Sequence, residues 1–361
     1  SRRPRADGRH ARPARAALRP RPDRTPAALQ SPVQCAGASP LRPAPATTPS
    51  PVAPAATALP KHFYKHLVGI IAGQAVAMDL VQTDEQALAY LRTKDAPVLL
   101  AKTQTPEQWQ LSDYAKGKAA GTISAVRFTD ARTLAGKYSA APNAAAQNFS
   151  LQESYTGSTP LLLNAQIQRQ GNCNTEGSTC FDWKVIYPQL PDTARYAAQI
   201  NPQIEQAVSR YLSNGQNTLA AAWEHQRQAF VKAKNPLWEV RLQPSVLYNQ
   251  DGKLSIGFEH YEQKGTAHPL RTTHYLSFQL QTGKALALTD FMTATQYQKL
   301  AGKKLAAAYP QAAATLSSRP LKMSADFYVA PDGIVISYPS GTLLPPQAGD
   351  LQVKIPFKEL Q

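Results

Sequence analysis

The chain of 361 residues predicts an α+β protein, with two helices packed on a mostly antiparallel sheet, preceded by a small all-β module and a disordered N-terminal tail. Three observations support this fold class. The first sixty residues are rich in Arg and Pro, short segments with alternating apolar residues follow, and helical spacing of apolar residues appears only after residue 190. We therefore divide the chain into 1–60, 61–167 and 168–361.

The tail, residues 1–60, holds ten Arg, no Lys and two Asp, so it supplies +8 of the net charge of +15. Thirteen of the thirty prolines also fall there. Such a segment buries too little apolar surface to offset the entropy of ordering, and we expect it to be disordered. Its Arg residues have no aromatic partners, so we expect no nucleic-acid partner. Three interpretations stay open: a basic arm, a flexible envelope tether, and translated upstream sequence that is not part of the mature protein.

The module at 61–167 is expected to consist of short strands separated by Gly, Asp, Asn and Pro clusters. The expected strands are 67–71, 75–81, 87–92, 97–101, 122–128, 149–155 and 161–167. Two interpretations compete for residues 61–77: a signal peptide, with two Lys before an apolar middle, and a strand pair with bends at Gly69 and Gly73. The longest apolar run, 67–78, is much shorter than the ~20 residues of a membrane helix, so we expect no transmembrane segment.

Two cysteines bracket a polar, turn-rich segment, Cys173-Asn-Thr-Glu-Gly-Ser-Thr-Cys180. The segment carries no further metal ligands, so we expect a disulfide between Cys173 and Cys180 and an oxidising compartment. Cys35 in the tail is left over. It is either a spare thiol or a lipid attachment point, although no lipobox precedes it.

In 168–361 the apolar spacing predicts helices at 194–213, 217–233 and 294–308. Pro191 and Asp192 precede the first helix, and Asn214-Gly215 is the expected stop. The expected strands are 238–248, 253–262, 272–281, 325–330, 334–338 and 351–356. Asp251-Gly252 is expected to form a tight turn between the first two of these strands.

Three blocks of this C-terminal half resemble the PdaC/RsiV-like family of bacterial envelope proteins. The first is Asp-Phe-Tyr-Val-Ala-Pro-Asp-Gly-Ile-Val-Ile-Ser-Tyr (326–338) with a Pro-rich loop and a closing strand after it. The second covers 246–291, where the family's Gly-rich loop is replaced by Gly-Thr-Ala-His-Pro (265–269). The third is the weaker pair Ile-Tyr-Pro-Gln-Leu (186–190) and Ile-Asn-Pro-Gln-Ile (200–204).

The family includes a lysozyme receptor and a non-catalytic region of a peptidoglycan deacetylase. The resemblance therefore implies an envelope-facing binding module, periplasmic, outer-membrane-tethered or secreted, and it names no ligand. The function that we expect is non-catalytic recognition of a peptidoglycan-type glycan or a lysozyme-like protein. The deacetylase signature itself is absent from the sequence. Two alternatives are a metal-assisted glycan hydrolase or deacetylase, and a structural envelope lipoprotein with no ligand.

Histidines are the first residues to test for catalysis. His260, His268 and His274 occur on one predicted hairpin, and His260 shares a strand face with Glu262, so a metal site is geometrically conceivable. The family pattern retains only His268, which indicates a structural hydrogen bond in the loop. No nucleophile, phosphate-loop or dinucleotide motif occurs. We expect no catalytic residue, no metal and no cofactor.

Aromatic residues near the matched loops are the remaining candidates for ligand binding, because Tyr is favoured where ligands stack. They are Tyr261, Tyr275, Tyr328 and Tyr338, together with the loop residue His268. The alternative is that the tyrosines face the core. The sequence leaves the oligomeric state open.

Overall fold

A computed structural model describes residues 59–360 apart from short internal gaps. The gaps are 85–86, 93–96, 103–108, 114–118, 142, 174–178, 214, 234–236, 266–267, 313–315, 317–320 and 325, and the side chains of 97–120 and 346 are also outside the description. The expectations for the tail and for Cys35 lie outside the described residues. The described residues belong to one compact unit, and the fold confirms the α+β class.

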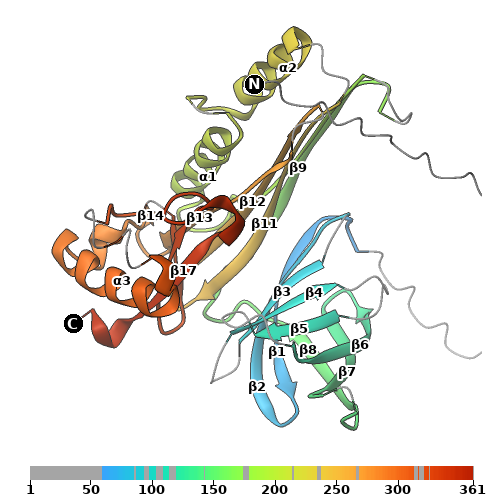
Figure 1. The fold of residues 1–361 in the computed structure, drawn as a ribbon. Helices are drawn as coiled ribbons and strands as arrows, with labels where there is room; N and C mark the ends of the chain where they lie inside the picture. Colours follow the sequence, from blue (N-terminus) through green and yellow to red (C-terminus); the bar gives the residue numbers. More distant parts are fainter. Residues whose placement is uncertain are drawn as a thin grey trace, which may run out of the picture. The chain divides into compact units, whose positions relative to one another are not determined.

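The first part of this unit is a closed antiparallel barrel, shown at the bottom of Figure 1. Its strands are β1 Phe63–Ile71, β2 Gln74–Gln82, β3 Ala87–Arg92, β4 Pro97–Lys102, β5 Trp109–Asp113, β6 Ala119–Asp130, β7 Thr133–Ser139 and β8 Gln147–Glu153. Each strand pairs with the next, and β1 closes the ring by pairing with β8. Buried apolar side chains fill the interior, among them Leu67, Met78 and Leu134.

Residues 61–77 belong to this barrel, so the strand-pair interpretation is the one that the structure shows. Ala72 and Gly73 form the turn between β1 and β2 with φ angles of 51° and 78°. The expected bend at Gly69 is wrong, because Gly69 lies inside β1. A Cβ atom there would come 2.7 Å from the Ser150 carbonyl oxygen, so this glycine is needed for the close approach of β8.

Two barrel strands, β5 and β7, were not expected from the sequence. In β7 only Leu134 is buried, and the other six residues are partly or fully exposed. A strand with one buried residue shows little of the alternation by which strands are recognised. Its place in the barrel comes from pairing with β6 and β8.

The second part is built on a six-stranded sheet in the order β14-β13-β12-β11-β10-β9. Its strands are β9 Leu162–Gly171, β10 Cys180–Gln189, β11 Leu237–Gln250, β12 Lys253–Lys264, β13 Leu270–Gln279 and β14 Lys284–Ala285. Neighbours are antiparallel except β10 and β11, which are parallel. β9 spans the expected boundary at 167/168, and the division into 61–167 and 168–361 stays a prediction.

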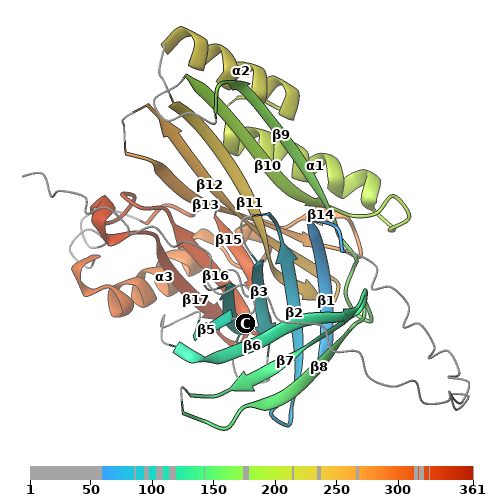
Figure 2. The same ribbon diagram turned by 90° about the vertical axis from the view of Figure 1, so that its right-hand side faces the viewer.

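The parallel pair needs a crossover, which contains helices α1 (Ala197–Leu212) and α2 (Leu219–Ala233). Figures 1 and 2 show both helices along one side of the long strands. The helices bury apolar residues spaced three or four apart, such as Ile200, Ile204 and Val208, against Phe181 and Trp183 of β10. The predicted helices are confirmed, and they begin three and two residues later than expected; α1 ends at Leu212, just before the expected stop, and α2 ends at Ala233 as expected.

The turn between β11 and β12 has the predicted form. Asp251 and Gly252 have φ angles of 53° and 70°, and Gln250 pairs with Lys253 across them. Two consecutive positive φ angles are those of the type I′ turn, which suits the right-handed twist of a hairpin. The expected Asp-Gly turn is confirmed.

A second, three-stranded sheet consists of β15 Phe327–Ala330, β16 Gly333–Tyr338 and β17 Leu351–Pro356. Helix α3 (Ala294–Ala308) packs against it, and short 3₁₀ helices lie at Leu288–Asp290, Pro310–Ala312, Pro346–Ala348 and Phe357–Glu359. α3 has the predicted bounds, since Thr293 and Gln296 form a capping box at its start.

The three-stranded sheet lies against part of the six-stranded sheet, on the face opposite α1 and α2. Serine hydroxyls join the two sheets: the Val329 N–H donates to Ser255 Oγ at 3.1 Å, and Ser255 Oγ donates to the Val329 carbonyl at 3.0 Å. Ser277 Oγ lies 2.9 Å from Ser255 Oγ. Both backbone groups of Val329 are thereby paired in a buried setting.

Candidate functional site

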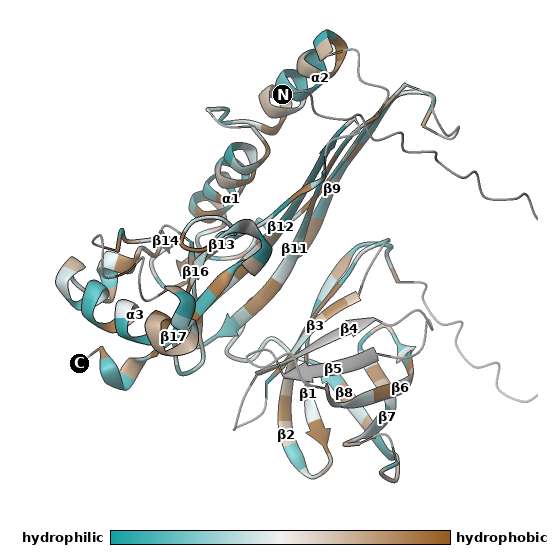
Figure 3. Cartoon of the chain, in the orientation of Figure 1, coloured by the Kyte–Doolittle hydropathy of each residue, from teal (hydrophilic) through white to brown (hydrophobic). Residues whose placement is uncertain are grey.

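The face of β11, β12 and β13 that turns away from α1 and α2 carries polar and aromatic side chains. Strand residues alternate between the two faces. Phe258 on β12 packs into the core with the helices, so its neighbours Gly257 and Glu259 point to the other face. The Glu259 side chain is 51% exposed. Hydrophilic residues are frequent along these strands (Figure 3).

A groove of about 280 Å³ lies on this face. We call it the sheet groove. Its lining consists of Gln243, Pro244 and Ser245 on β11, Glu259 on β12, Thr273 and Tyr275 on β13, Leu88 and Tyr90 on β3, and Asp350 and Gln352 at β17. Strand pairing places Gln243 opposite Glu259 and Glu259 opposite Thr273. An amide, a carboxylate and a hydroxyl therefore stand side by side across three strands.

Tyr275 is held at the floor of the sheet groove. Gln352 donates from Nε2 to the Tyr275 hydroxyl oxygen at 2.8 Å, and the Tyr275 and Tyr328 rings lie 5.1 Å apart. Both tyrosine residues are at least 93% buried. The groove thus has a fixed aromatic floor and polar groups at its sides, a combination typical of small-ligand sites.

Two residues beyond Glu259 on β12, Tyr261 lies between two arginines. Pairing places Arg241 and Arg271 on either side of Tyr261. Their guanidinium carbons lie 5.7 Å and 5.3 Å from the Tyr261 ring centroid, within the range of cation–π attraction. We call these three residues the tyrosine row. Tyr261 donates from its hydroxyl to Gln263 Oε1 at 2.7 Å, and its ring is half-buried.

The candidate ligand residues from the sequence fall into different environments. Tyr275 lines the sheet groove, Tyr328 supports it, and Tyr261 forms the neighbouring tyrosine row. Tyr338 lies elsewhere, in the core under α3, with its hydroxyl against that of Tyr297. His268 is exposed in the loop between β12 and β13. Sequence reasoning did not identify Gln243, Glu259 and Asp350 as ligand-binding residues, because they come from different parts of the chain with no common motif.

His260 and His274 lie on the helix-covered face. His274 stacks on Tyr211 of α1 with ring centroids 4.2 Å apart, and its Nδ1 lies 3.5 Å from Asp326 Oδ1. Burial lowers the pKa of His260 to about 4. Among the described residues, no three His, Cys, Asp or Glu side chains come together in a way that could hold a metal ion. His268 is not brought to the other two histidines.

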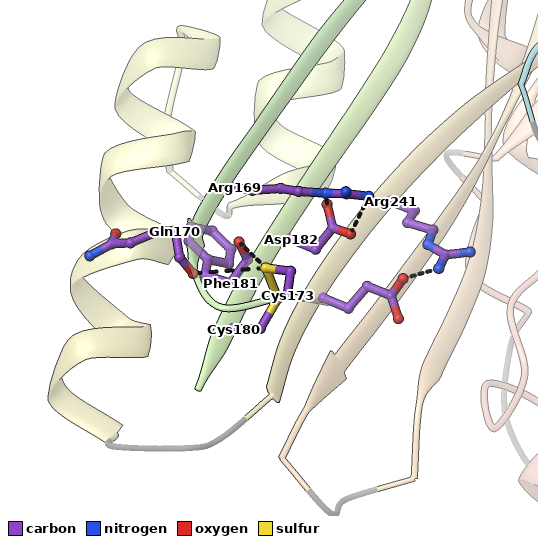
Figure 4. The surroundings of a disulfide bond; sticks show 8 residues. Arg169, Gln170, Cys173, Cys180, Phe181, Asp182 and Arg241 are labelled. Atoms are coloured by element: carbon purple, nitrogen blue, oxygen red, sulfur yellow. Dashed lines mark hydrogen bonds and ion pairs between the residues drawn. A yellow bond between two sulfur atoms is a disulfide. The ribbon is translucent and has the colours of Figure 1, made fainter. Parts of the chain in front are cut away.

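The predicted disulfide between Cys173 and Cys180 is confirmed, with Cα atoms 4.8 Å apart. Figure 4 shows it at the end of β9 and β10, beside Arg169 and Asp182. Gly171 and Cys180 are the last paired residues of these strands. The bond therefore closes the hairpin at the point where strand pairing stops.

A buried polar cluster in the barrel was also missed by sequence reasoning. Asp79 is fully buried; it accepts a hydrogen bond from the Tyr64 hydroxyl at 2.6 Å, and its Oδ1 lies 2.7 Å from His66 Nδ1. Arg92 Nη1 lies 2.5 Å from Asp79 Oδ2. The signal in the sequence was Asp79, a single acidic residue in an otherwise apolar strand. A carboxylate buried in such a strand needs hydrogen-bond donors or a positive charge beside it. Tyr64, His66 and Arg92 surround the carboxylate with a hydrogen bond and two close charge contacts, as in a structural network.

Family models match two segments of the chain. One is described as deacetylase PdaC and matches residues 174–271; the other is described as protein of unknown function (DUF3298) and matches residues 287–358. No curated protein matches the chain. In the part of the chain that the structure describes, no helix is long and apolar enough to cross a membrane.

Two solved structures are similar to this chain. A DUF3298 family member from Bacteroides fragilis NCTC 9343 is 15% identical, with 56% of this chain and 93% of that chain covered and a TM-score of 0.44. A DUF3298 family protein from Pseudomonas aeruginosa PAO1 is 21% identical, with 57% and 94% covered and a TM-score of 0.44.

The two family matches agree with the resemblance found in the sequence, in the same order along the chain. The two matched segments, residues 174–271 and 287–358, therefore support a PdaC/DUF3298-like family for the C-terminal half of the chain, and the function of the DUF3298 family is unknown.

Proposed function

We propose that this protein is a non-catalytic binding protein of the cell envelope and that it takes a peptidoglycan-type glycan in the sheet groove. The observation that carries the proposal is the groove itself. An amide, a carboxylate and a hydroxyl (Gln243, Glu259 and Thr273) lie side by side above the Tyr275 floor. Sugar hydroxyls both donate and accept hydrogen bonds, and these three side chains include both acceptors and donors for them.

The tyrosine row gives the glycan a second contact. Tyr261 is half-buried on the same face as the groove residues, and Arg271, which packs over its ring, has an exposed guanidinium that can donate hydrogen bonds to sugar hydroxyls. The position of Tyr261 next to Glu259 on the same face extends the sheet groove along β12. Because both contacts are on strands, the ligand would meet side chains that are already in place.

An extracytoplasmic location is part of this proposal. The disulfide between Cys173 and Cys180 fits an oxidising compartment, and the matched family is associated with the envelope. A protein in the cell envelope would have peptidoglycan within reach.

A lysozyme-like protein is the second candidate ligand. The sheet groove has two carboxylates, Glu259 and Asp350, at its sides. Acidic side chains in a groove suit a basic partner, because complementary charge steers association and fixes orientation. A glycan in the sheet groove would contact the tyrosine row directly, whereas a protein would contact Tyr261 only at the edge of its interface.

The test is sedimentation with purified peptidoglycan in parallel with biolayer interferometry against c-type lysozyme. For a glycan ligand we expect Tyr261→Ala and Glu259→Gln each to weaken peptidoglycan binding by about tenfold, equivalent to about 1.4 kcal/mol. Glu224→Gln on α2, on the other side of the sheet, is the matched control and should bind normally. Lysozyme binding without peptidoglycan binding would favour the second candidate, and no binding to either would refute the proposal.

The absence of catalysis is tested separately. Purified protein is incubated with peptidoglycan, and the release of reducing ends and of free acetate is measured. We expect neither to exceed the level without protein. Release of either product, or bound zinc that is lost in His268→Ala, would favour the metal-assisted enzyme instead.

A further inference from the structure

The outer edge of the six-stranded sheet is a long, exposed strand. β9 comes last in the strand order, and all ten of its residues, Leu162–Gly171, pair with β10 on one side. Among the described residues, no strand pairs with its other side. The central part, 165–169, is mostly exposed. An edge of this kind presents unpaired N–H and C=O groups that can pair with another strand.

β9 lacks the features that usually protect an edge. The strand contains no Pro and no Lys. Its single charged residue, Arg169, bonds to Asp182 of the neighbouring strand through Nε and Oδ1 at 3.2 Å. Ile167 in the middle of the strand is 46% exposed. The opposite edge differs, because β14 has only two residues and one of them is Lys284.

We propose that the β9 edge pairs with the β9 edge of a second copy of this chain, in an antiparallel arrangement about a two-fold axis at Ile167. In this register Ile167 lies opposite Ile167 of the second copy. Arg169 lies opposite Ala165, and Gln166 opposite Gln168. Directly opposed side chains in an antiparallel pair share a face and lie close together. The pairing therefore joins two exposed isoleucines and brings no like charges together.

The second copy fits this edge better than the chain's own tail. Thirteen of the first sixty residues are Pro, and Pro cannot donate to a strand ladder. Self-pairing also satisfies the rule for two-fold interfaces, in which the same patch is used by both partners. The two six-stranded sheets would become one continuous sheet. Both sheet grooves would then lie on the same surface, so a polymeric ligand could engage two sites at once.

The mass of the full chain in solution tests the pairing. Sedimentation equilibrium over a concentration series is expected to show twice the chain mass. Ile167→Lys places two ammonium groups opposite each other and should leave only single chains. Val231→Lys is the matched control, because Val231 is 53% exposed on α2, away from the edge. Single chains at every concentration, or a dimer that survives Ile167→Lys, would overturn the proposal.

Cross-linking tests the register in the same protein. In a Cys35→Ser background, Ile167→Cys should form an intermolecular disulfide under mild oxidation, because opposed strand residues are near disulfide distance. Arg169→Cys faces Ala165 and should cross-link at least tenfold more slowly. Circular dichroism confirms that each variant is folded. Faster cross-linking of Arg169→Cys than of Ile167→Cys would overturn the register.

Discussion

Asn249 on β11 donates from Nδ2 to the Tyr64 hydroxyl oxygen on β1 at 2.7 Å, joining residues that are 185 positions apart. Tyr64 in turn donates to Asp79 Oδ1, so a chain of hydrogen bonds runs from the six-stranded sheet into the barrel. Asn249 is anchored by Thr159, whose N–H donates to its Oδ1 at 3.1 Å. The barrel is thus tied to the sheet by a buried polar link as well as by apolar packing.

Removing the Tyr64 hydroxyl should destabilise the protein. Tyr64→Phe removes one hydrogen bond to Asp79 and one from Asn249, and each lost hydrogen bond between buried groups costs about 1 kcal/mol. We expect a loss of about 2 kcal/mol in the free energy of unfolding, measured by urea titration. Tyr138→Phe removes a hydroxyl outside this chain of hydrogen bonds and serves as the control. Equal stability of the two variants would show that the link contributes nothing.

Folding stability should decrease in mild acid because of His260. Burial lowers its pKa to about 4, Glu262 opposes the shift, and His274 adds to it. The unfolded chain takes up the proton near the ordinary pKa of about 6.5, and the folded chain only near pH 4. The contribution is full above pH 6.5 and is lost as the pH falls towards 4, up to about 3 kcal/mol.

His260→Leu should flatten this pH dependence. Urea midpoints between pH 7.5 and 4.5 are compared for the parent chain, His260→Leu and His268→Leu, which alters an exposed loop histidine. We expect only His260→Leu to lose the pH dependence of the urea midpoint. If His260→Leu keeps the slope of the parent chain, the pH dependence of stability comes from other groups.

The disulfide should stabilise the hairpin end of β9 and β10. Cys173 and Cys180 are seven positions apart, and closing so short a loop restricts the unfolded chain by about 2.5 kcal/mol in the loop-entropy model. Replacing both cysteines with Ser is expected to lower the unfolding free energy by about that amount. Reducing agent should lower the thermal midpoint of the parent chain and leave that of the double variant unchanged. A reductant effect on the double variant would point to another cause.

Two glycine substitutions should have opposite effects. A Cβ at Gly69 would lie 2.7 Å from the Ser150 carbonyl oxygen and 2.8 Å from a Leu151 methyl carbon, so Gly69→Ala should cost about 1–3 kcal/mol by forcing β1 and β8 apart. A Cβ at Gly302 in α3 meets open space. Gly302→Ala should therefore stabilise by up to about 1 kcal/mol through helix propensity. Thermal midpoints moving in the same direction would contradict this account.

Local signals predicted a large part of the fold. The bounds of α3 were predicted correctly, because Thr293 and Gln296 mark its start and the apolar spacing continues to its end. The Asp251-Gly252 turn was predicted because few other residue pairs adopt two positive φ angles. The strand β7 was missed, since only Leu134 among its residues is buried.

The candidate site was harder to predict, because burial depends on elements far apart in the sequence. Alternation along β13 places Tyr275 on one face but does not reveal that Tyr328 of β15 covers its ring. Glu259 and Asp350 share the sheet groove without a common motif. The link between Tyr64 and Asn249 likewise leaves no local pattern.

The hydroxyl of Ser255 constrains which sequences can adopt this fold. It is the partner of both backbone groups of Val329, so an alanine at this position leaves a buried N–H and a buried C=O to compete for Ser277. Thr keeps the hydroxyl but adds a methyl group at a fully buried position. In a saturation mutagenesis screen for folded protein, position 255 should accept fewer residue types than the apolar position Ile256 beside it. One small polar side chain is thus expected to be less replaceable than the larger apolar residues of the core.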